Sequence, residues 1–355
     1  MPGKKMVDDA DGGPWENPLG LAGIEFIEFS AFSEHEVDEL TRVFTTLGFA
    51  EAGRHRSKDV IWFHQGEINF VLNREPDSFA RSYAIVHGLS VCAMGFRVRD
   101  SRAVIQRAVA HGAHPYEERI GPGEIRIPAI RGVYGSLIYL VDFFGQRGSV
   151  FDVEFRPLPS SPSRARDAGL KRIDHVSLSV LSGRSQQWVD FYRELFGFHE
   201  WSHNQIRDPN GIVVSTVVSS PCGKIHIPIN ESPDEDTSCS RFLRDYFGEG
   251  VQHIAVESDD LFASVQAIEG NGLSLLPMPG GFYDDLLKGG EFNADFVQQL
   301  RQHNILVDTE DGGQYLHAYT KPIAGRFYFE IVQRQNYRGF GRKNASVRLE
   351  ALAKL

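Results

Sequence analysis

Short runs in which apolar and polar residues alternate recur along the chain and predict a protein rich in β-strands. Three of them lie in the second half, at residues 170–180, 250–257 and 326–334. Alternation with a period of two places successive side chains on opposite faces of a strand, so that one face of each run can be buried. The first two runs each carry one His and the third carries Glu330, among apolar, β-branched or aromatic neighbours, which favour strands.

The hydrophobic pattern of the first half returns in the second half. In both halves a strand is followed by an amphipathic helix that ends at a Gly-Phe pair. The distance from Phe26 to Phe49 is 23 residues, and the distance from His175 to Phe198 is also 23. A matching period of this kind indicates an internal duplication. The predicted segments are strand 23–30 and helix 34–47 in the first half, and strand 173–178 and helix 185–195 in the second.

The duplication predicts two domains joined by a linker. Residues 157–169 are rich in Pro, Ser and Arg, which is typical of a boundary between domains. Residues 17–156 then form an N-terminal domain and residues 170–355 a C-terminal domain. We expect residues 1–16, which are polar, acidic and rich in Gly, to form a flexible tail.

The two His and the Glu on these strands, His175, His253 and Glu330, are candidate metal ligands. A buried carboxylate is costly unless a metal ion or a cationic side chain pairs with it. A single His on an apolar strand is more often a hydrogen-bonded core residue than a metal ligand. Two His and one carboxylate, however, form the ligand set of non-haem Fe(II) oxygenases, which leaves positions open for substrate and oxygen. The sequence therefore favours a metal site.

The first half provides an internal comparison for this site. In our alignment of the repeats, the three positions correspond to Phe26, Gly95 and Asp152. Neither Phe nor Gly can bind a metal through its side chain. We therefore expect the first half to be free of metal.

Charge and composition exclude several classes of partner. A net charge of -10 and a pI of about 5.7 argue against binding to nucleic acid or to an anionic membrane. No apolar run reaches the roughly 18 residues that a membrane helix needs. The three cysteines, Cys92, Cys222 and Cys239, are too few for a disulfide framework. We expect reduced thiols in a cytoplasmic protein.

Seven segments of the chain carry motifs of a known family: 17–29, 55–58, 65–73, 88–98, 227–231, 248–253 and 329–334. They resemble segments of bacterial 4-hydroxyphenylpyruvate dioxygenases, and the resemblance covers roughly residues 17 to 342. It implies an α+β fold of the vicinal-oxygen-chelate type, with two tandem domains of paired βαβββ modules and a C-terminal gating helix. In that family Fe(II) is bound by residues that match His175, His253 and Glu330.

The resemblance also implies a reaction. Members convert 4-hydroxyphenylpyruvate and O2 to homogentisate and CO2, in tyrosine catabolism, with the three metal ligands as catalytic residues. The carboxylate and keto oxygens of the 2-oxo acid chelate the iron, and the protein supplies geometry and a dry pocket. Family members form dimers or tetramers, which implies a homo-oligomer here.

We assign eight further residues to the substrate site or its gate. In the run 224–230, period-two alternation places Pro228 and Asn230 on the face opposite the isoleucines. Phe340 and Asn344 match the gate of the family, where a terminal helix closes over the site. The full set is Ser215, Pro228, Asn230, Gln252, His317, Tyr328, Phe340 and Asn344.

Three positions depart from the family pattern. His317 and Ser238 stand where the family usually has Gln, and Ala345 stands where an aromatic ring packs on the substrate. Because these positions contact the aromatic ring and its phenol, changing them should change substrate choice. His317 is either a replacement hydrogen-bond donor or a general acid or base. Its segment and the chain end after Asn344 look more like the dioxygenase-like domain fused to some 3-dehydroshikimate dehydratases.

These departures leave other functions open. One is a related iron oxygenase that makes a hydroxymandelate or acts on another 2-oxo acid. Another, from a different class, is a binding module without catalysis. The complete set of metal ligands argues against the binding module.

Overall fold

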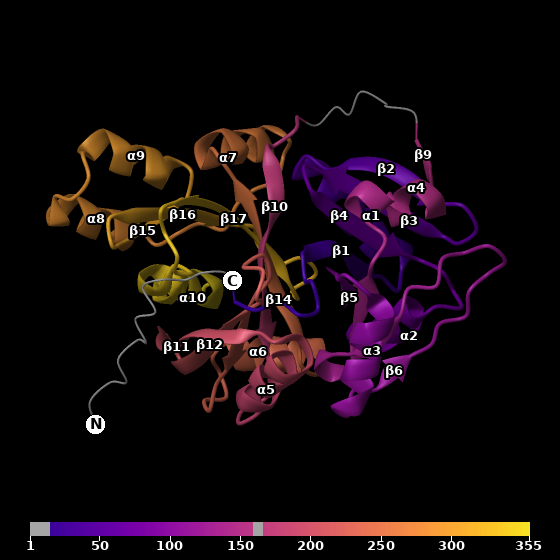
Figure 1. Ribbon diagram of the computed structural model, residues 1–355. Helices are drawn as coiled ribbons and strands as arrows, with labels where there is room; N and C mark the ends of the chain where they lie inside the picture. The colour runs from indigo at the N-terminus through magenta and orange to yellow at the C-terminus, as the bar shows by residue number, and fades with distance from the viewer. Residues whose placement is uncertain (1–14, 159–165) are drawn as a thin grey trace.

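The computed structural model describes residues 15–158 and 166–355, which fold into two β-sheets flanked by helices (Figure 1). Residues 1–14 of the expected tail lie outside the described residues. So do residues 159–165 of the expected linker.

The described part of the first half forms a nine-stranded sheet with the strand order β6-β7-β8-β5-β1-β4-β3-β2-β9. Its strands are β1 (Gly23–Ser30), β2 (Ala50–His55), β3 (Val60–Gln65), β4 (Ile68–Asn73), β5 (Ser90–Arg97), β6 (Pro115–Tyr116), β7 (Ala129–Arg131), β8 (Leu137–Val141) and β9 (Phe155–Pro157). Its helices are α1 (Glu34–Thr46), α2 (Phe79–His87), α3 (Ser101–Ala110) and α4 (Val150–Glu154), with the single turns η1 (Val133–Gly135) and η2 (Gly145–Arg147).

The described part of the second half forms an eight-stranded sheet with the order β11-β12-β13-β10-β14-β17-β16-β15. Its strands are β10 (Leu170–Ser179), β11 (His199–Asp208), β12 (Gly211–Ser219), β13 (His226–Glu231), β14 (Gly250–Ser258), β15 (Leu306–Glu310), β16 (Gly313–Tyr319) and β17 (Tyr328–Gln335). Its helices are α5 (Ser185–Phe196), α6 (Ser238–Tyr246), α7 (Leu261–Gly270), α8 (Gly280–Gly289), α9 (Ala294–Gln302) and α10 (Ala345–Ala353), which follows the turn η3 (Arg342–Asn344).

The two sheets share one topology. In the first, β1 pairs in parallel with β4 and antiparallel with β5, and β5 pairs in parallel with β8. In the second, β10, β13, β14 and β17 repeat these pairings. Each half therefore consists of two βαβββ modules whose first strands meet at the centre of the sheet. This arrangement confirms the predicted α+β fold and the duplication.

Local signals in the sequence explain where the equivalent helices begin and end. Ser33 caps α1, and Glu36 completes a capping box by accepting the backbone N–H of Ser33. Gly197 ends α5 in a left-handed conformation, with φ of 73°. These signals fix the helices that cover one face of each sheet.

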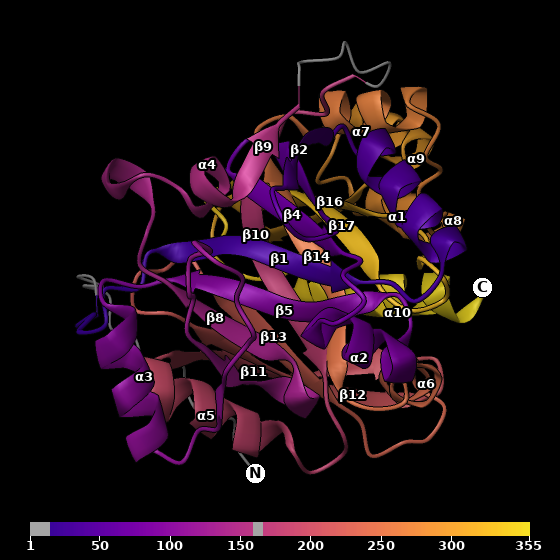
Figure 2. The ribbon, with the colours of Figure 1, turned by 90° about the vertical axis from the view of Figure 1, so that its right-hand side faces the viewer.

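The two sheets bury their apolar faces in a common core. The ring of Phe29 lies 5.6 Å from that of Phe327, and the ring of Phe70 lies 5.6 Å from that of Phe329, between centroids. In Figure 2 the first sheet lies in front of the second. Because the apolar faces are turned toward this core, the other face of each sheet is free to form a site.

The structure corrects one strand of the prediction. The alignment of the repeats makes Asp152 the counterpart of Glu330 and so predicts a strand there, but Val150–Glu154 is the short helix α4. The hydroxyl of Ser149 accepts the backbone N–H of Phe151 and so starts a helical turn. The short apolar pattern fits a helix as well as a strand, and the place equivalent to β17 is taken by β8. Asp152 is therefore not the counterpart of Glu330.

The strand register gives the correct counterparts. Phe26 pairs with Gly95 as His175 pairs with Ala255, so Gly95 corresponds to Ala255 and not to His253. By the same register the counterpart of His253 is Ala93.

Tyr139 takes the place of Glu330. It pairs with Gly95 in the first sheet as Glu330 pairs with Ala255 in the second. Phe26, Ala93 and Tyr139 thus occupy the three positions of the first half that are equivalent to the ligand positions of the second.

Two further features bear on the expectations. The three cysteines, all within the described residues, are free. None of the helices in the described ranges is long and apolar enough to cross a membrane.

Candidate metal centre

Three neighbouring strands place His175, His253 and Glu330 on one face of the second sheet. His175 on β10 and Glu330 on β17 both pair with Ala255 on the strand between them, β14. Paired residues point to the same face, and so does His253, two positions before Ala255. Ala255 therefore lies between His175 and Glu330 on this face, and its methyl group is shorter than the side chains on either side of it.

The ligand atoms of these side chains converge. Nε2 of His175 lies 3.3 Å from Nε2 of His253 and 3.3 Å from Oε2 of Glu330. Nε2 of His253 lies 3.4 Å from the same oxygen. All three residues are at most 3% exposed. Such a cluster of lone pairs, removed from water, is stable when a cation lies between them, and the N2O donor set suits iron(II).

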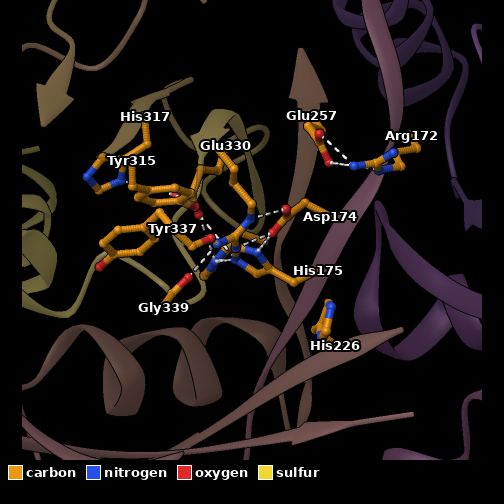
Figure 3. A network of polar contacts seen from close by, with 12 residues as sticks. Arg172, Asp174, His175, His226, Glu257, Tyr315, His317, Glu330, Tyr337 and Gly339 are labelled. Atoms are coloured by element: carbon orange, nitrogen blue, oxygen red, sulfur yellow. Dashed lines mark hydrogen bonds and ion pairs between the residues drawn. The ribbon is translucent and has the colours of Figure 1, made fainter. Parts of the chain in front are cut away.

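Asp174 holds His175 in a fixed orientation (Figure 3), and Arg334 pairs with Asp174. Oδ1 of Asp174 accepts a hydrogen bond from Nδ1 of His175 at 2.7 Å, which leaves the Nε2 lone pair free for a metal. Burial disfavours both charged groups. Arg334 nevertheless keeps the pKa of Asp174 well below its usual range, and hydrogen bonds to Asp174 and Glu330 raise the pKa of His175.

A β-bulge explains why Asp174 reaches its neighbour. Ile173 pairs with Val256 and His175 with Ala255, so Asp174 is an extra residue on β10. A bulge turns a side chain out of the regular alternation. Without it, Asp174 would point to the face opposite His175.

The second oxygen of Glu330 accepts hydrogen bonds from two tyrosine hydroxyl groups and one imidazole. Oε1 accepts hydrogen bonds from Tyr315 at 3.0 Å and Tyr319 at 2.9 Å, and from Nδ1 of His317 at 3.1 Å. Burial opposes ionisation, but the hydrogen bonds from His175, His253 and His317 hold the pKa of Glu330 well below its usual range. The carboxylate is therefore charged, and its Oε2 faces the imidazoles.

His253 is held differently from His175. Its Nδ1 is buried without a hydrogen-bond partner among the described residues, and burial lowers its pKa to about 3. The ring of Tyr328 stacks on it at 5.0 Å between centroids. His253 is thus a neutral imidazole whose Nε2 can donate its lone pair to a metal.

The structure places most of the expected substrate residues around this centre. Pro228 and Asn230 lie on the same face of the sheet as His175, one strand away on β13. Ser215 on β12 pairs with Asn230. The amide of Asn230 donates a hydrogen bond to Oγ of Ser177 at 2.8 Å. This bond connects the side chains of β13 and β10 on this face of the sheet.

Gln252 and the gate residues reach the centre from other directions. Gln252 is an extra residue at a second bulge, on β14, and its amide lies 3.5 Å from the carbonyl oxygen of Ser238. The ring of Phe340 lies 5.4 Å from that of His175. Nδ2 of Asn344 donates to Nε2 of His317 at 3.2 Å and so connects the start of α10 to the sheet.

Sequence reasoning missed several residues of the site. Asp174 directly precedes His175, and Tyr315 and Tyr319 stand two positions on either side of His317, so alternation alone would have placed the tyrosines on its face. Arg348 on α10 had no such signal. Its guanidinium lies 5.5 Å from the ring centroid of Tyr319.

Known proteins resemble both halves of the chain. Residues 15–156 match the family described as hydroxyphenylpyruvate dioxygenase, N-terminal, and residues 172–289 match the Glyoxalase/Bleomycin resistance protein/Dioxygenase superfamily. A 4-hydroxyphenylpyruvate dioxygenase of Pseudomonas aeruginosa is 36% identical over 338 residues, or 95% of this chain and 94% of that protein. Hemolysin VllY of Vibrio vulnificus is 40% identical over 340 residues, with 95% of both proteins covered.

A solved structure agrees with these relatives. A fusion of a xylose isomerase-like TIM barrel with a 4-hydroxyphenylpyruvate dioxygenase superposes with a TM-score of 0.82 at 37% identity. The match covers 97% of this chain and 54% of the fusion protein, so the chain spans about half of it. Near full-length identity to a dioxygenase and a shared fold lead to one conclusion: the chain belongs to the 4-hydroxyphenylpyruvate dioxygenase-like family and is an enzyme of the non-haem iron dioxygenase class.

Proposed function

We propose that this protein is an Fe(II)-dependent 2-oxo acid dioxygenase that converts 4-hydroxyphenylpyruvate and O2 to homogentisate and CO2. The observation that supports the proposal is the convergence of His175, His253 and Glu330 within a shell that orients two of them. Bound iron(II) would supply the redox chemistry that couples oxygen activation to decarboxylation of the 2-oxo acid.

The residues of the chain would prepare this chemistry. The three ligands would hold the ion on one side and leave its other side for the carboxylate and keto oxygens of the substrate and for oxygen. Asp174 and Arg334 would keep the first imidazole from rotating. Phe340, whose ring packs against His175, would exclude water together with α10, and a dry site favours the oxidation of substrate over side reactions.

A second candidate function is favoured by Arg348. Nε of this side chain is buried without a hydrogen-bond partner among the described residues. Although burial opposes its charge, the nearby Tyr328, Tyr319 and Glu330 keep the pKa of Arg348 above its ordinary value, so it is a cation. The phenol of 4-hydroxyphenylpyruvate is neutral at its far end. A 2-oxo acid with a second anionic group would pair with Arg348 better.

Oxygen uptake with identified products distinguishes these functions. Protein reconstituted with Fe(II) under anaerobic conditions would be supplied with 4-hydroxyphenylpyruvate, phenylpyruvate or 4-carboxyphenylpyruvate, and each product identified by mass and chromatography. Glu330→Gln serves as the inactive control.

Each outcome has one meaning. Oxygen uptake that yields homogentisate supports the proposed reaction. Oxygen uptake that yields a hydroxymandelate assigns the related hydroxymandelate-forming reaction. Uptake with 4-carboxyphenylpyruvate alone supports the second candidate. No uptake with any of the three substrates by an iron-loaded protein overturns both.

We further propose a cytoplasmic protein, on the basis of its free cysteines, and a homo-oligomer, on the basis of the family resemblance. Size-exclusion chromatography with light scattering tests the second part. A mass of 39.8 kDa, that of one chain, would contradict it.

A further inference from the structure

A cavity of about 310 Å³ opens in the first half of the molecule, away from the metal centre. Phe26 and Tyr139, which occupy the positions of His175 and Glu330, both line it. The cavity therefore lies on the face of the first sheet that is equivalent to the metal-binding face of the second.

At two of the positions equivalent to the metal ligands, the first half has the aromatic rings of Phe26 and Tyr139 in the cavity wall. A Cβ atom built on Gly95 would lie 2.6 Å from the ring of Phe26, so that ring fills the space beside the strand. Ala93 at the third position has no ligand atom. The remaining wall is mostly apolar and includes Val60, Val71, Tyr116, Ile127, Phe151 and Phe155.

One buried carboxyl group in this wall has no ion pair with a basic side chain among the described residues. Glu28 on β1 is 5% exposed, and its Oε1 accepts a hydrogen bond from Nδ2 of Asn73 at 2.7 Å. Two other carboxylates of the wall have basic partners: Glu124 lies 3.2 Å from Nζ of Lys58, and Glu154 lies 3.2 Å from Nε of Arg56. Glu28 thus remains available to a ligand.

We propose that this cavity binds a small aromatic molecule that carries a basic amine, with the ring among the apolar side chains and the ammonium group at Glu28. The volume accommodates a ligand of about ten non-hydrogen atoms. A carboxylate beside an aromatic wall is a suitable environment for an ammonium group. The site is independent of the function proposed above.

The charge of the wall selects against acids. Five lining residues are glutamates, whereas Lys58 and Arg126 are the lining Lys and Arg side chains among the described residues. An anionic 2-oxo acid would meet this excess of negative charge. The cavity is therefore not a second site for the proposed substrate.

The state of Glu28 agrees with a cationic ligand. Burial raises its pKa to about 7, against the hydrogen bond from Asn73, while the charges of Glu118 and Lys58 act in opposite directions. An ammonium group would favour the ionised form. Amine binding near pH 6 should therefore release a proton, which calorimetry in buffers of different ionisation enthalpy detects.

The test compares three probes of similar size on the whole chain. Phenethylamine, 2-phenylethanol and 3-phenylpropionate would be titrated by calorimetry and by ligand-observed NMR. We expect the amine to bind at least about tenfold more tightly than the acid. Glu28→Gln should weaken the amine about tenfold and leave the alcohol unchanged, and Val71→Trp should fill the cavity and block both.

A variant of the metal centre separates the two sites. His175→Ala should leave amine binding unchanged, because the cavity lies in the other half. Acid binding as strong as amine binding, or amine binding that survives Val71→Trp in a folded protein, overturns the proposal. So does the loss of amine binding in His175→Ala. If Val71→Trp does not fold, Glu28→Gln alone decides: unchanged amine affinity in that variant rejects the site.

Discussion

The guanidinium of Arg334 donates two hydrogen bonds to the carboxylate of Asp174, from Nε at 2.6 Å and from Nη2 at 2.8 Å. The two residues lie on β17 and β10, with β14 between them. Asp174 in turn accepts the hydrogen bond of His175. The orientation of one metal ligand therefore depends on a charged pair in which neither member is itself one of the three ligands.

Replacing Arg334 by Met should weaken metal binding. Asp174 would lose its buried partner, and His175 would lose its fixed orientation. We expect the affinity for Co(II), a spectroscopic substitute for iron, to fall roughly 10- to 100-fold in a titration followed by visible absorption. The matched control is Arg172→Met. That arginine lies on β10, the strand of Asp174, and pairs with Glu257 on β14 at 2.7 Å, but it is exposed. Equal effects of both substitutions would contradict this role.

Replacing Glu330 by Gln should abolish the stabilisation that metal gives to the fold. A ligand that binds only the folded state raises the free energy of unfolding by about 2.7 kcal/mol when its free concentration is 100 times its Kd. Thermal unfolding with and without Fe(II) under anaerobic conditions measures this. Glu249→Gln, a change at another fully buried glutamate, is the control and should retain the metal effect. If metal still raised the Tm of the Glu330→Gln variant, Glu330 would not be a metal ligand.

The two interpretations of His317 predict different properties for variants at this position. If it serves only as a hydrogen-bond donor to Glu330, His317→Gln should retain oxygen uptake, and the pH profile of kcat should not change. His317→Leu should then lose roughly 1.5 to 3 kcal/mol of interaction with the carboxylate, seen as weaker metal binding. Loss of one limb of the kcat profile in His317→Gln would instead identify a general acid or base.

Arg348→Leu should change substrate choice. We expect kcat/KM for 4-carboxyphenylpyruvate to fall roughly 10- to 100-fold, because a charge-assisted hydrogen bond is lost, and kcat/KM for phenylpyruvate to change little. Arg342→Leu is the control, since that arginine is exposed and contacts Asn204 at 3.2 Å. A similar loss for both substrates would show that Arg348 supports the fold of α10 and not the choice of substrate.

Glu28 should make stability depend on pH. Its folded pKa of about 7 lies above the value of about 4.3 in an unfolded chain. The contribution of the protonated Glu28 to the free energy of unfolding is thus fully present below about pH 4.3 and is lost as the pH rises through 7.

Glu28→Gln cannot ionise and isolates this effect. The free energy of unfolding of the natural protein minus that of the variant should fall by about 3 kcal/mol between about pH 4.5 and pH 8. Denaturant unfolding at several pH values measures the difference. A difference that stays constant over this range would contradict the raised pKa.

The sequence by itself determined the repeat, the strands and the candidate metal ligands His175, His253 and Glu330. Alternation is a local property, because the pleat of a strand sends successive side chains to opposite faces wherever the strand lies. The matching distances around Phe26 and His175 revealed the duplication for the same reason. The expected faces of Pro228 and Asn230 also agree with the structure.

The tertiary structure decided whatever depends on pairing between distant segments. The bulges at Asp174 and Gln252 arise from the register between β10 and β14, which no local pattern encodes. Register also made Tyr139, and not Asp152, the counterpart of Glu330. Arg348 approaches the centre only because α10 packs beside the sheet. The polar shell of the metal centre and the cavity of the first half are therefore properties of the folded chain.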